Sequence, residues 1–273
     1  MAASFRWNKV CVLFFLIMLT FDRRNIIFAQ DWEEEKSAHF IIAYSNRQNS
    51  SWAHEVLSKA EGYYDKIADK LGYSRYDNFW TWDNRVKIIV YSDKDTFIKE
   101  TGQPPWSLGG AVVDHRLQSG MIITYKQQDG FLESVLPHEL GHLILRDFIG
   151  KDIQIPLWFD EGVAQLQESE KGDEAEHAMR SLVRNRRYIP LRDLLNLDIR
   201  SELDPLKVAI FYAESVSILN FLITKYGSSQ FGELCKFLRE GRTFEEALKG
   251  AYSSSVDSIE GLQEKWLDYM QNS

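Results

Sequence analysis

The feature that most constrains this chain of 273 residues is the string HELGH at His138 to His142. On a helix, two residues four apart lie about 40° apart around the axis and about 6 Å apart along it, so both imidazoles can reach one ion. Glu139 lies on the adjoining face, where a carboxylate can act as a general base beside the ion. The motif therefore predicts a helix that supplies two metal ligands and a base.

A third ligand is available from a second predicted helix. Gly150 is expected to end the first helix, and a new apolar segment opens near Leu157 and carries Glu161. Eighteen residues separate Glu161 from His142. Two imidazoles and one carboxylate make a site with an open fourth position, which is the arrangement of catalytic zinc sites. We therefore expect Zn²⁺ to be bound by His138, His142 and Glu161.

Two other interpretations of the motif lead away from catalysis. HExxH could be a solvated helix face, but its flanking residues are apolar and would bury the histidines; they are Leu136, Leu140, Leu143 and Ile144. An ion could also serve the fold alone, but structural zinc sites usually have four protein ligands rather than three. Pro137 is expected in the first turn of the helix or at a kink just before it, and either position keeps the histidine face intact.

The residues around Glu161 carry a resemblance to a known family. HExxH followed by a glutamate in a second helix is the pattern of the gluzincin metallopeptidases. The segment LWFDEGVA at residues 157–164 resembles the tryptophan, glutamate, glycine and alanine segment of aminopeptidase N-like enzymes. The smaller peptidase MA-like domains are more similar still. The resemblance is close over residues 131–170 and looser over residues 39–270.

This resemblance implies a thermolysin-like catalytic domain that hydrolyses peptide bonds. In such a domain His138, His142 and Glu161 would be the zinc ligands, and Glu139 would take a proton from water and pass it to the leaving amine. The alternative is a peptidase-like domain that binds a peptide or a partner protein without turnover. The presence of Glu139 favours the enzyme.

The resemblance also suggests Tyr212 as the group that stabilises the tetrahedral intermediate. The stretch FYAES at residues 211–215 resembles a tyrosine-bearing helix of peptidase MA-like domains, and a hydroxyl can donate to an oxyanion. The alternative is that Tyr212 packs between helices with its hydroxyl satisfied. His115, Tyr125 and His177 are weaker candidates for the same role.

Gly110 and Ala111 are candidates for contact with the substrate. They belong to the run GGAVV at residues 109–113, and a strand with glycines can pair with an extended peptide. In aminopeptidase relatives the matching strand supplies a glutamate that binds the substrate's amino group, whereas Val113 stands near that position here. Endopeptidase activity is therefore favoured over aminopeptidase activity. An ordinary glycine-rich turn is the alternative for this segment.

The order of predicted elements indicates an α+β fold. Strands are expected over residues 39–44, 85–91, 109–113 and 121–125, the last two as an antiparallel hairpin. Helices are expected over residues 51–71, 93–101, 131–148, 157–170, 173–185, 211–226, 231–240, 243–250 and 256–271. The pattern is a small N-terminal mixed sheet with helices, followed by a helical C-terminal half, in a single domain over residues 30–273. The acidic stretch 31–36 is expected to be mobile.

The N-terminus has the features of a secretory signal. Arg6 and Lys9 precede an apolar run over residues 10–21, and Ala29 is a small residue at a suitable cleavage position. The run is shorter than the ~20 residues of a membrane-spanning helix, and an uncleaved membrane anchor is the alternative. We therefore expect residues 1–29 to be a signal peptide and the chain to be secreted or periplasmic.

Net charge and cysteine content argue against two classes of function. A formal net charge of −8 disfavours binding to nucleic acid, so a peptide or protein is the expected partner. Of the two cysteines, Cys11 lies in the signal segment and Cys235 is left alone. No disulfide framework and no cysteine-rich metal site is expected.

Overall fold

The structure is a computed structural model that describes residues 32–45, 50–73, 85–103, 107, 109–114, 119–126, 130–202 and 204–272. By its packing the chain divides into two compact units. The described residues within 1–58 and 82–129 form the first, called the sheet unit below, and those within 59–81 and 130–273 form the second, called the helical unit. The single domain expected over residues 30–273 stays a prediction. The expected signal peptide lies outside the described residues.

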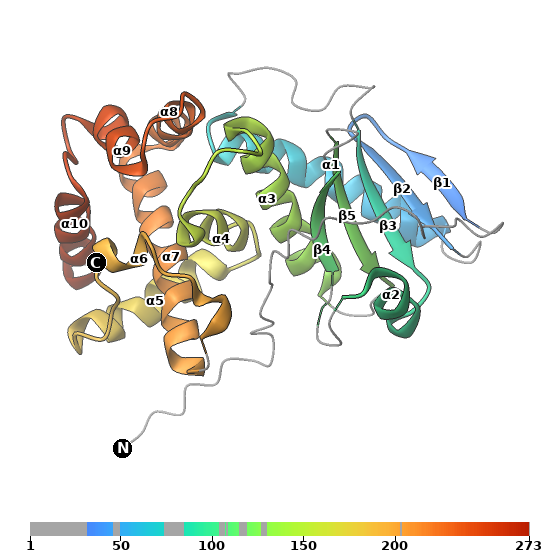
Figure 1. Ribbon diagram of the computed structural model, residues 1–273, viewed down its shortest axis with the longest axis horizontal. Coiled ribbons are helices and arrows are strands. Elements are labelled where there is room, and N and C mark those ends of the chain that lie inside the picture. Colours follow the sequence, from blue (N-terminus) through green and yellow to red (C-terminus); the bar gives the residue numbers. More distant parts are fainter. Residues whose placement is uncertain are drawn as a thin grey trace. The chain divides into compact units, whose positions relative to one another are not determined.

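Among its described residues, the sheet unit contains a five-stranded mixed sheet in the order β1-β2-β3-β5-β4 (Figure 1). The strands are β1 (Glu33–Lys36), β2 (Phe40–Tyr44), β3 (Val86–Tyr91), β4 (Gly109–Asp114) and β5 (Ser119–Tyr125). Strand β3 pairs in parallel with β2 and β5, and the outer pairs β1–β2 and β4–β5 are antiparallel. The central strands are rich in buried isoleucine and valine, whose branched side chains suit a covered pleated sheet. The predicted mixed sheet and the predicted hairpin are both confirmed.

Strand β1 corrects one expectation, because residues 33–36 form an edge strand rather than a mobile segment. The hydroxyl of Tyr44 on β2 donates to Glu35 at 2.7 Å, and Lys87 on β3 pairs with Glu34 at 2.8 Å. These partners belong to other strands, and Lys87 is 53 residues away from Glu34, so the local acidic composition could not reveal the strand. Charged residues on an edge strand also discourage pairing with other chains.

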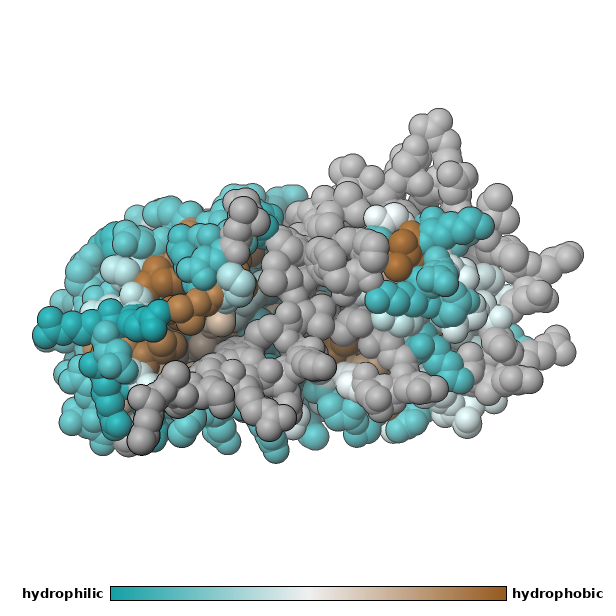
Figure 2. Space-filling model, turned by 90° about the horizontal axis from the view of Figure 1, so that it is seen from below, coloured by the Kyte–Doolittle hydropathy of each residue, from teal (hydrophilic) through white to brown (hydrophobic). Residues whose placement is uncertain are grey.

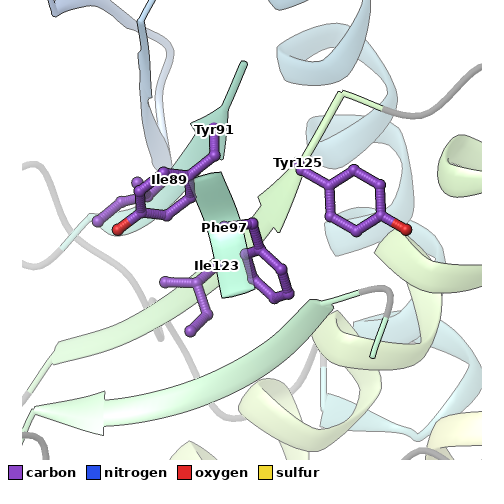
Figure 3. Packing of buried hydrophobic residues seen from close by; sticks show 5 residues of the cluster. All are labelled: Ile89, Tyr91, Phe97, Ile123 and Tyr125. Atoms are coloured by element: carbon purple, nitrogen blue, oxygen red, sulfur yellow. The ribbon is translucent and has the colours of Figure 1, made fainter. Parts of the chain in front are cut away.

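Helix α2 (Lys94–Thr101) is joined to the sheet by an apolar cluster. Asp93 caps the start of the helix, and its carboxylate accepts the backbone N–H of Thr96 at 2.8 Å. The cluster consists of Ile89, Tyr91, Phe97, Ile123 and Tyr125 (Figure 3). The ring centroid of Phe97 lies 5.3 Å from that of Tyr125 and 6.0 Å from that of Tyr91. Tyr125, a weaker candidate for chemistry, is therefore part of the packing between α2 and the sheet.

The helical unit contains the second part of α1 and the helices that follow residue 130. They are α1 (Ser50–Lys70, with residues 59–70 in this unit), the π-helix η4 (Phe131–Val135), α3 (Leu136–Ile149), α4 (Leu157–Gln165), α5 (Lys171–Arg184), α6 (Leu191–Leu194), the 3-10 helix η5 (Ile199–Ser201), α7 (Pro205–Tyr226), α8 (Ser228–Arg239), α9 (Phe244–Tyr252) and α10 (Ile259–Asn272). The predicted helical C-terminal half is confirmed. Together with the mixed sheet it makes the fold α+β.

Two helix boundaries differ from the predicted ones by about five residues, and the others by about three or fewer. Helix α4 ends at Gln165 rather than at residue 170, because the chain leaves the helix through turns before α5 begins. Helix α7 begins at Pro205 rather than at residue 211. There Asp204 accepts the N–H of Leu206, and proline fits the first helical turn, where its missing N–H is not needed. The short helix α6 has no counterpart among the predicted helices.

Helix α7 supplies much of the core of the helical unit. Among the described residues it is the one helix long and apolar enough to cross a membrane. However, 67% of its most apolar stretch is buried within the protein, as in a core helix. Figure 2 shows apolar side chains grouped on one face of the helical unit among hydrophilic ones. Leu206, near the start of α7, is the most exposed large apolar side chain among the described residues, at 44%.

Candidate metal centre

A π-helical turn, η4, precedes helix α3 and shapes the backbone ahead of HELGH. Pro137 lies in the first turn of α3, as the sequence predicts, and it has no N–H to donate to the turn before it. In that preceding turn the carbonyl of Glu133 accepts the N–H of Ser169 at 3.4 Å. The π turn therefore ties the start of α3 to the segment that follows α4.

His138, His142 and Glu161 come together inside the helical unit. One ligand-capable atom from each side chain lies within 4.8 Å of the others. The three residues are almost fully buried, at 0%, 3% and 2% exposure. The two imidazole centroids are 4.9 Å apart, with an angle of 76° between the ring planes. The structure thus unites the three residues singled out by spacing in a group that could hold a metal ion.

Two glycines allow the helices of this group to approach each other. A Cβ atom added at Gly141, within HELGH, would lie 2.8 Å from Cα of Ala164 on α4. One added at Gly162, next to Glu161, would lie 2.9 Å from the carbonyl oxygen of Ser215 on α7. Neither backbone neighbour can give way as a flexible side chain would. Close backbone packing of α3, α4 and α7 therefore requires glycine at both positions.

His138 is held by a carboxylate from beyond the end of α4. Its Nδ1 lies 2.9 Å from Oε1 of Glu168, and Oε2 of Glu168 accepts the hydroxyl of Ser134 at 2.7 Å. Burial raises the pKa of Glu168, but the hydrogen bond and charge of His138 and the hydrogen bond from Ser134 outweigh it and bring the pKa below its usual value. Glu168 is therefore an ionised acceptor, and His138 donates from Nδ1.

His142 is held by a second carboxylate, Asp160 of α4. Nδ1 of His142 lies 2.8 Å from Oδ1 of Asp160. Oδ2 accepts Nε of Arg146 at 3.0 Å and Nη2 at 2.6 Å, and Nη1 donates to the carbonyl of Ile153 at 2.9 Å. Burial raises the pKa of Asp160, but the charges and hydrogen bonds of His142 and Arg146 outweigh it and lower the pKa to about 2. Asp160 is therefore ionised as well.

These contacts leave Nε2 of each imidazole as the nitrogen that could bind a metal ion. A neutral imidazole donates from one nitrogen and offers a lone pair on the other. Because Nδ1 donates to a carboxylate in both His138 and His142, the lone pair lies on Nε2. Carboxylate partners of this kind also fix the ring direction and make the ligand nitrogen more basic.

Buried carboxylate oxygens test whether the group suits a cation. Oε2 of Glu161 and Oε2 of Glu139 are buried and accept no hydrogen bond from the part of the chain that the structure describes. Burial raises the pKa of Glu161 to about 8; His138 opposes this shift, and the charges of Asp160 and Glu139 add to it. A divalent cation would supply the opposite charge that such a carboxylate lacks. Two imidazoles and a carboxylate are a donor set that zinc accepts, so the residues fit the expected ion.

The other predicted site residues lie on two further elements. Tyr212 is buried on α7, three residues before Ser215, which packs against Gly162. Gly110 and Ala111 lie on β4, at one edge of the described sheet. The chemical roles of these three residues stay predictions. Of the weaker candidates, His177 is exposed on α5, and His115 lies outside the described residues.

The sequence singles out the three candidate ligands that the structure brings together, but it does not reveal the residues that hold the imidazoles, Asp160, Glu168 and Arg146. A signal for Asp160 is present, because an aspartate inside the apolar run LWFDEGVA would be costly to bury without a partner. Glu168 gives no such signal, because it lies beyond the end of α4, where helical periodicity no longer applies. Arg146 follows His142 by one helical turn, but spacing alone does not distinguish it from a solvated arginine.

Comparison with known protein families gives one match. A family model described as the peptidase MA superfamily matches residues 81–272, a range that includes the ligand group and its supports. No match was found among curated proteins. The family match confirms the resemblance carried by HELGH and Glu161 and supports a peptidase-type enzyme. With 192 of its 273 residues inside the match, this chain belongs to the peptidase MA superfamily.

Proposed function

We propose that this protein is an exported zinc-dependent metallopeptidase that hydrolyses peptide bonds with Glu139 as the general base. The proposal is carried by the buried group of His138, His142 and Glu161, whose ligand atoms lie within 4.8 Å of one another, together with the buried carboxylate of Glu139. The superfamily match supports a peptidase-type enzyme. The family resemblance further supports a thermolysin-like arrangement of the gluzincin class.

The ion and the protein side chains divide the chemistry between them. When bound, zinc would supply Lewis acidity, which acidifies water and polarises a peptide carbonyl. Nε2 of His138, Nε2 of His142 and the carboxylate of Glu161 would hold the ion as three protein ligands. Glu139, whose Oε2 accepts no hydrogen bond from the described residues, takes the proton of the attacking water and gives it to the leaving amine.

Tyr212 completes the proposed catalytic group by donating its hydroxyl hydrogen to the developing oxyanion. Its place on α7 supports this role, because α7 packs at Ser215 against Gly162, the residue after Glu161. If turnover does not depend on this hydroxyl, Tyr212 has only a packing role between helices.

Gly110 and Ala111 are proposed to bind the extended backbone of the substrate. They lie on β4, which ends the described sheet, so one side of this strand has no strand partner among the described residues. Among the described residues, a Cβ added at Gly110 would meet only Nε2 of Gln103, at 3.7 Å. Endopeptidase activity is favoured over aminopeptidase activity, because Val113 stands near the position where aminopeptidases carry the glutamate that binds the amino terminus.

The proposal of export is supported by the sequence of residues 1–29, with Arg6 and Lys9 before an apolar run. Outside the cytoplasm the expected substrate is a peptide or a protein. The formal net charge of −8 agrees with this choice over nucleic acid.

The decisive experiment compares wild type with Glu139→Gln for zinc content and for hydrolysis of an unstructured protein substrate. We expect both proteins to carry zinc and the variant to lose roughly 10²–10⁴-fold in turnover, the usual contribution of a general base. Glu176→Gln is the matched control, because Glu176 is a partly buried glutamate on α5 that pairs with Arg180 at 2.8 Å. This control is expected to keep wild-type turnover.

Two outcomes would reject the enzyme. If both proteins bind zinc and neither cleaves any of a broad set of peptides, the domain binds peptide or a partner without turnover. If the wild type carries no stoichiometric zinc, the assignment of His138, His142 and Glu161 as a zinc site is wrong.

A further inference from the structure

Arg146 makes more contacts than an ordinary ion pair. It lies on α3, one turn after His142, and its side chain is 15% exposed. Nε and Nη2 both donate to Oδ2 of Asp160, while Nη1 donates to the carbonyl of Ile153. A planar guanidinium can bind two acceptors through such a fork, whereas the ammonium of lysine cannot.

Through these contacts Arg146 connects the two helices that carry the ligands. Ile153 lies in the connection between α3 and α4, and Asp160 directly precedes Glu161 on α4. The other oxygen of Asp160 holds Nδ1 of His142 at 2.8 Å. One side chain therefore bears on both the direction of the His142 ring and the position of the helix that carries Glu161.

The support of His138 is of a different kind. Glu168 lies beyond the end of α4, and the hydroxyl of Ser134 donates to it at 2.7 Å. A neutral hydroxyl is a weaker donor to a carboxylate than a guanidinium that binds through two nitrogens. His142 and Glu161 thus share a charged support, while His138 depends on a separate one.

We infer that Arg146 is a positioning residue that sets His142 and Glu161 relative to each other through Asp160 and thereby determines the zinc affinity. The inference rests on the proposed function, because it takes the ligand group to bind zinc. Arg146 itself touches neither the ion nor the substrate. Its effect is therefore visible in metal binding without any measurement of turnover.

The test measures the Zn²⁺ affinity of the full-length protein by competition with a chromophoric chelator. Arg146→Gln is expected to bind zinc on the order of 10–100-fold more weakly, as is usual when the partner of a metal-binding histidine is disturbed. Arg146→Lys is expected to recover little of this loss, because lysine keeps the charge but loses the fork. Arg180→Gln breaks a comparable 2.8 Å arginine–glutamate pair on α5 and is expected to bind zinc like the wild type.

A double-variant cycle distinguishes positioning from a general loss of structure. If Arg146 acts through Asp160, adding Arg146→Gln to Asp160→Asn weakens zinc binding by less than about 2-fold beyond Asp160→Asn alone. If the loss of zinc affinity in the double variant instead equals the product of the two single-variant losses, Arg146 acts by another route and the inference is overturned.

The remaining outcomes separate this inference from the proposed function. A wild type without zinc rejects the proposed function and this inference together. A wild type that binds zinc, with Arg146→Gln or Arg146→Lys at the same affinity, rejects the inference alone. If circular dichroism shows that Arg146→Gln does not fold, the milder Arg146→Lys decides by the same criterion.

Discussion

The sheet unit and the helical unit bury different kinds of side chain. Among the described residues, the sheet unit buries one charged side chain, Arg85, which donates to the carbonyl of Ala38 at 3.2 Å. The helical unit buries two imidazoles and five carboxyl groups: His138, Glu139, His142, Asp160, Glu161, Glu168 and Glu214. The groups that can bind an ion or move a proton are therefore concentrated in one unit.

The difference shows where each unit obtains its stability. Apolar packing, as between α2 and the sheet, stabilises in proportion to the area removed from water and is insensitive to protons and ions. A buried carboxyl group is tolerated only if it is neutral, paired or bound to a cation. The stability of the helical unit is therefore expected to respond to pH and metal, and that of the sheet unit to packing.

The largest effect on stability is expected from Phe97, a fully buried residue in the cluster of the sheet unit. Phe97→Ala is expected to lower the free energy of unfolding by about 3–5 kcal/mol, because it removes a ring and leaves a cavity. Chemical denaturation measures this loss, and Lys99→Ala at an exposed position of the same helix is expected to change it by less than about 0.5 kcal/mol. The zinc affinity of folded Phe97→Ala is expected to equal that of wild type, and a parallel fall would break the comparison between the units.

A smaller loss is expected where the helices of the candidate metal centre touch. Gly162→Ala would place Cβ 2.8 Å from Cδ1 of Leu219 and 2.9 Å from the carbonyl oxygen of Ser215, so overpacking is expected to cost about 1–3 kcal/mol. Gly62→Ala on α1 is the control, because its Cβ meets none of the described residues within 4 Å and alanine is expected to stabilise the helix by roughly 0.5–1 kcal/mol. Thermal denaturation of both variants checks the prediction, which is wrong if the two shift in the same direction.

The smallest expected effect on stability is a pH dependence in the helical unit, caused by the buried carboxyl group of Glu214. Burial raises the pKa of Glu214 from 4.5 to about 8, against a lowering by the hydrogen bond from the N–H of Ile189. The folded protein therefore keeps a proton that the unfolded chain releases above pH 4.5, so stability falls as the pH rises toward about 8, by roughly 1.4 kcal/mol per pH unit. Glu214→Gln, which cannot ionise, is expected to reduce the slope between pH 6 and pH 7 by that amount. Denaturant titrations at both pH values measure it, and an unchanged slope would mean that Glu214 is ionised in the folded protein.

The part of the molecule that the sequence predicts is the part set by local patterns. The β-branched runs predict β2, β3 and β5, and the spacing of HELGH predicts two neighbouring imidazoles. Glu161 could be predicted as the third candidate ligand because the turn after α3 and the apolar start of α4 are both local signals. The same signals cannot predict β1, because its glutamates are paired by Tyr44 and Lys87 from other strands.

Asp160 and Glu168, which hold the two imidazoles, show most clearly what local sequence patterns cannot predict. Whether Asp160 turns toward His142 depends on the angle at which α4 crosses α3, and no periodicity in either helix contains that angle. Glu168 reaches His138 only because the chain leaves α4 after Gln165 and is tied at Ser169 to the π turn. The start of α7 is a different case, because Asp204 followed by Pro205 is a recognisable helix start in the sequence.

The close approach at Gly141 has a consequence for protein design. A designer who transfers two histidines and a glutamate to another pair of helices would copy the ligands but not the distance between the backbones. Here that distance depends on the hydrogen atom that replaces a side chain at Gly141, opposite Cα of Ala164. A larger residue at the crossing point would hold the two helices apart before any ion arrived. The choice of small residues at the crossing therefore has to come before the choice of ligands.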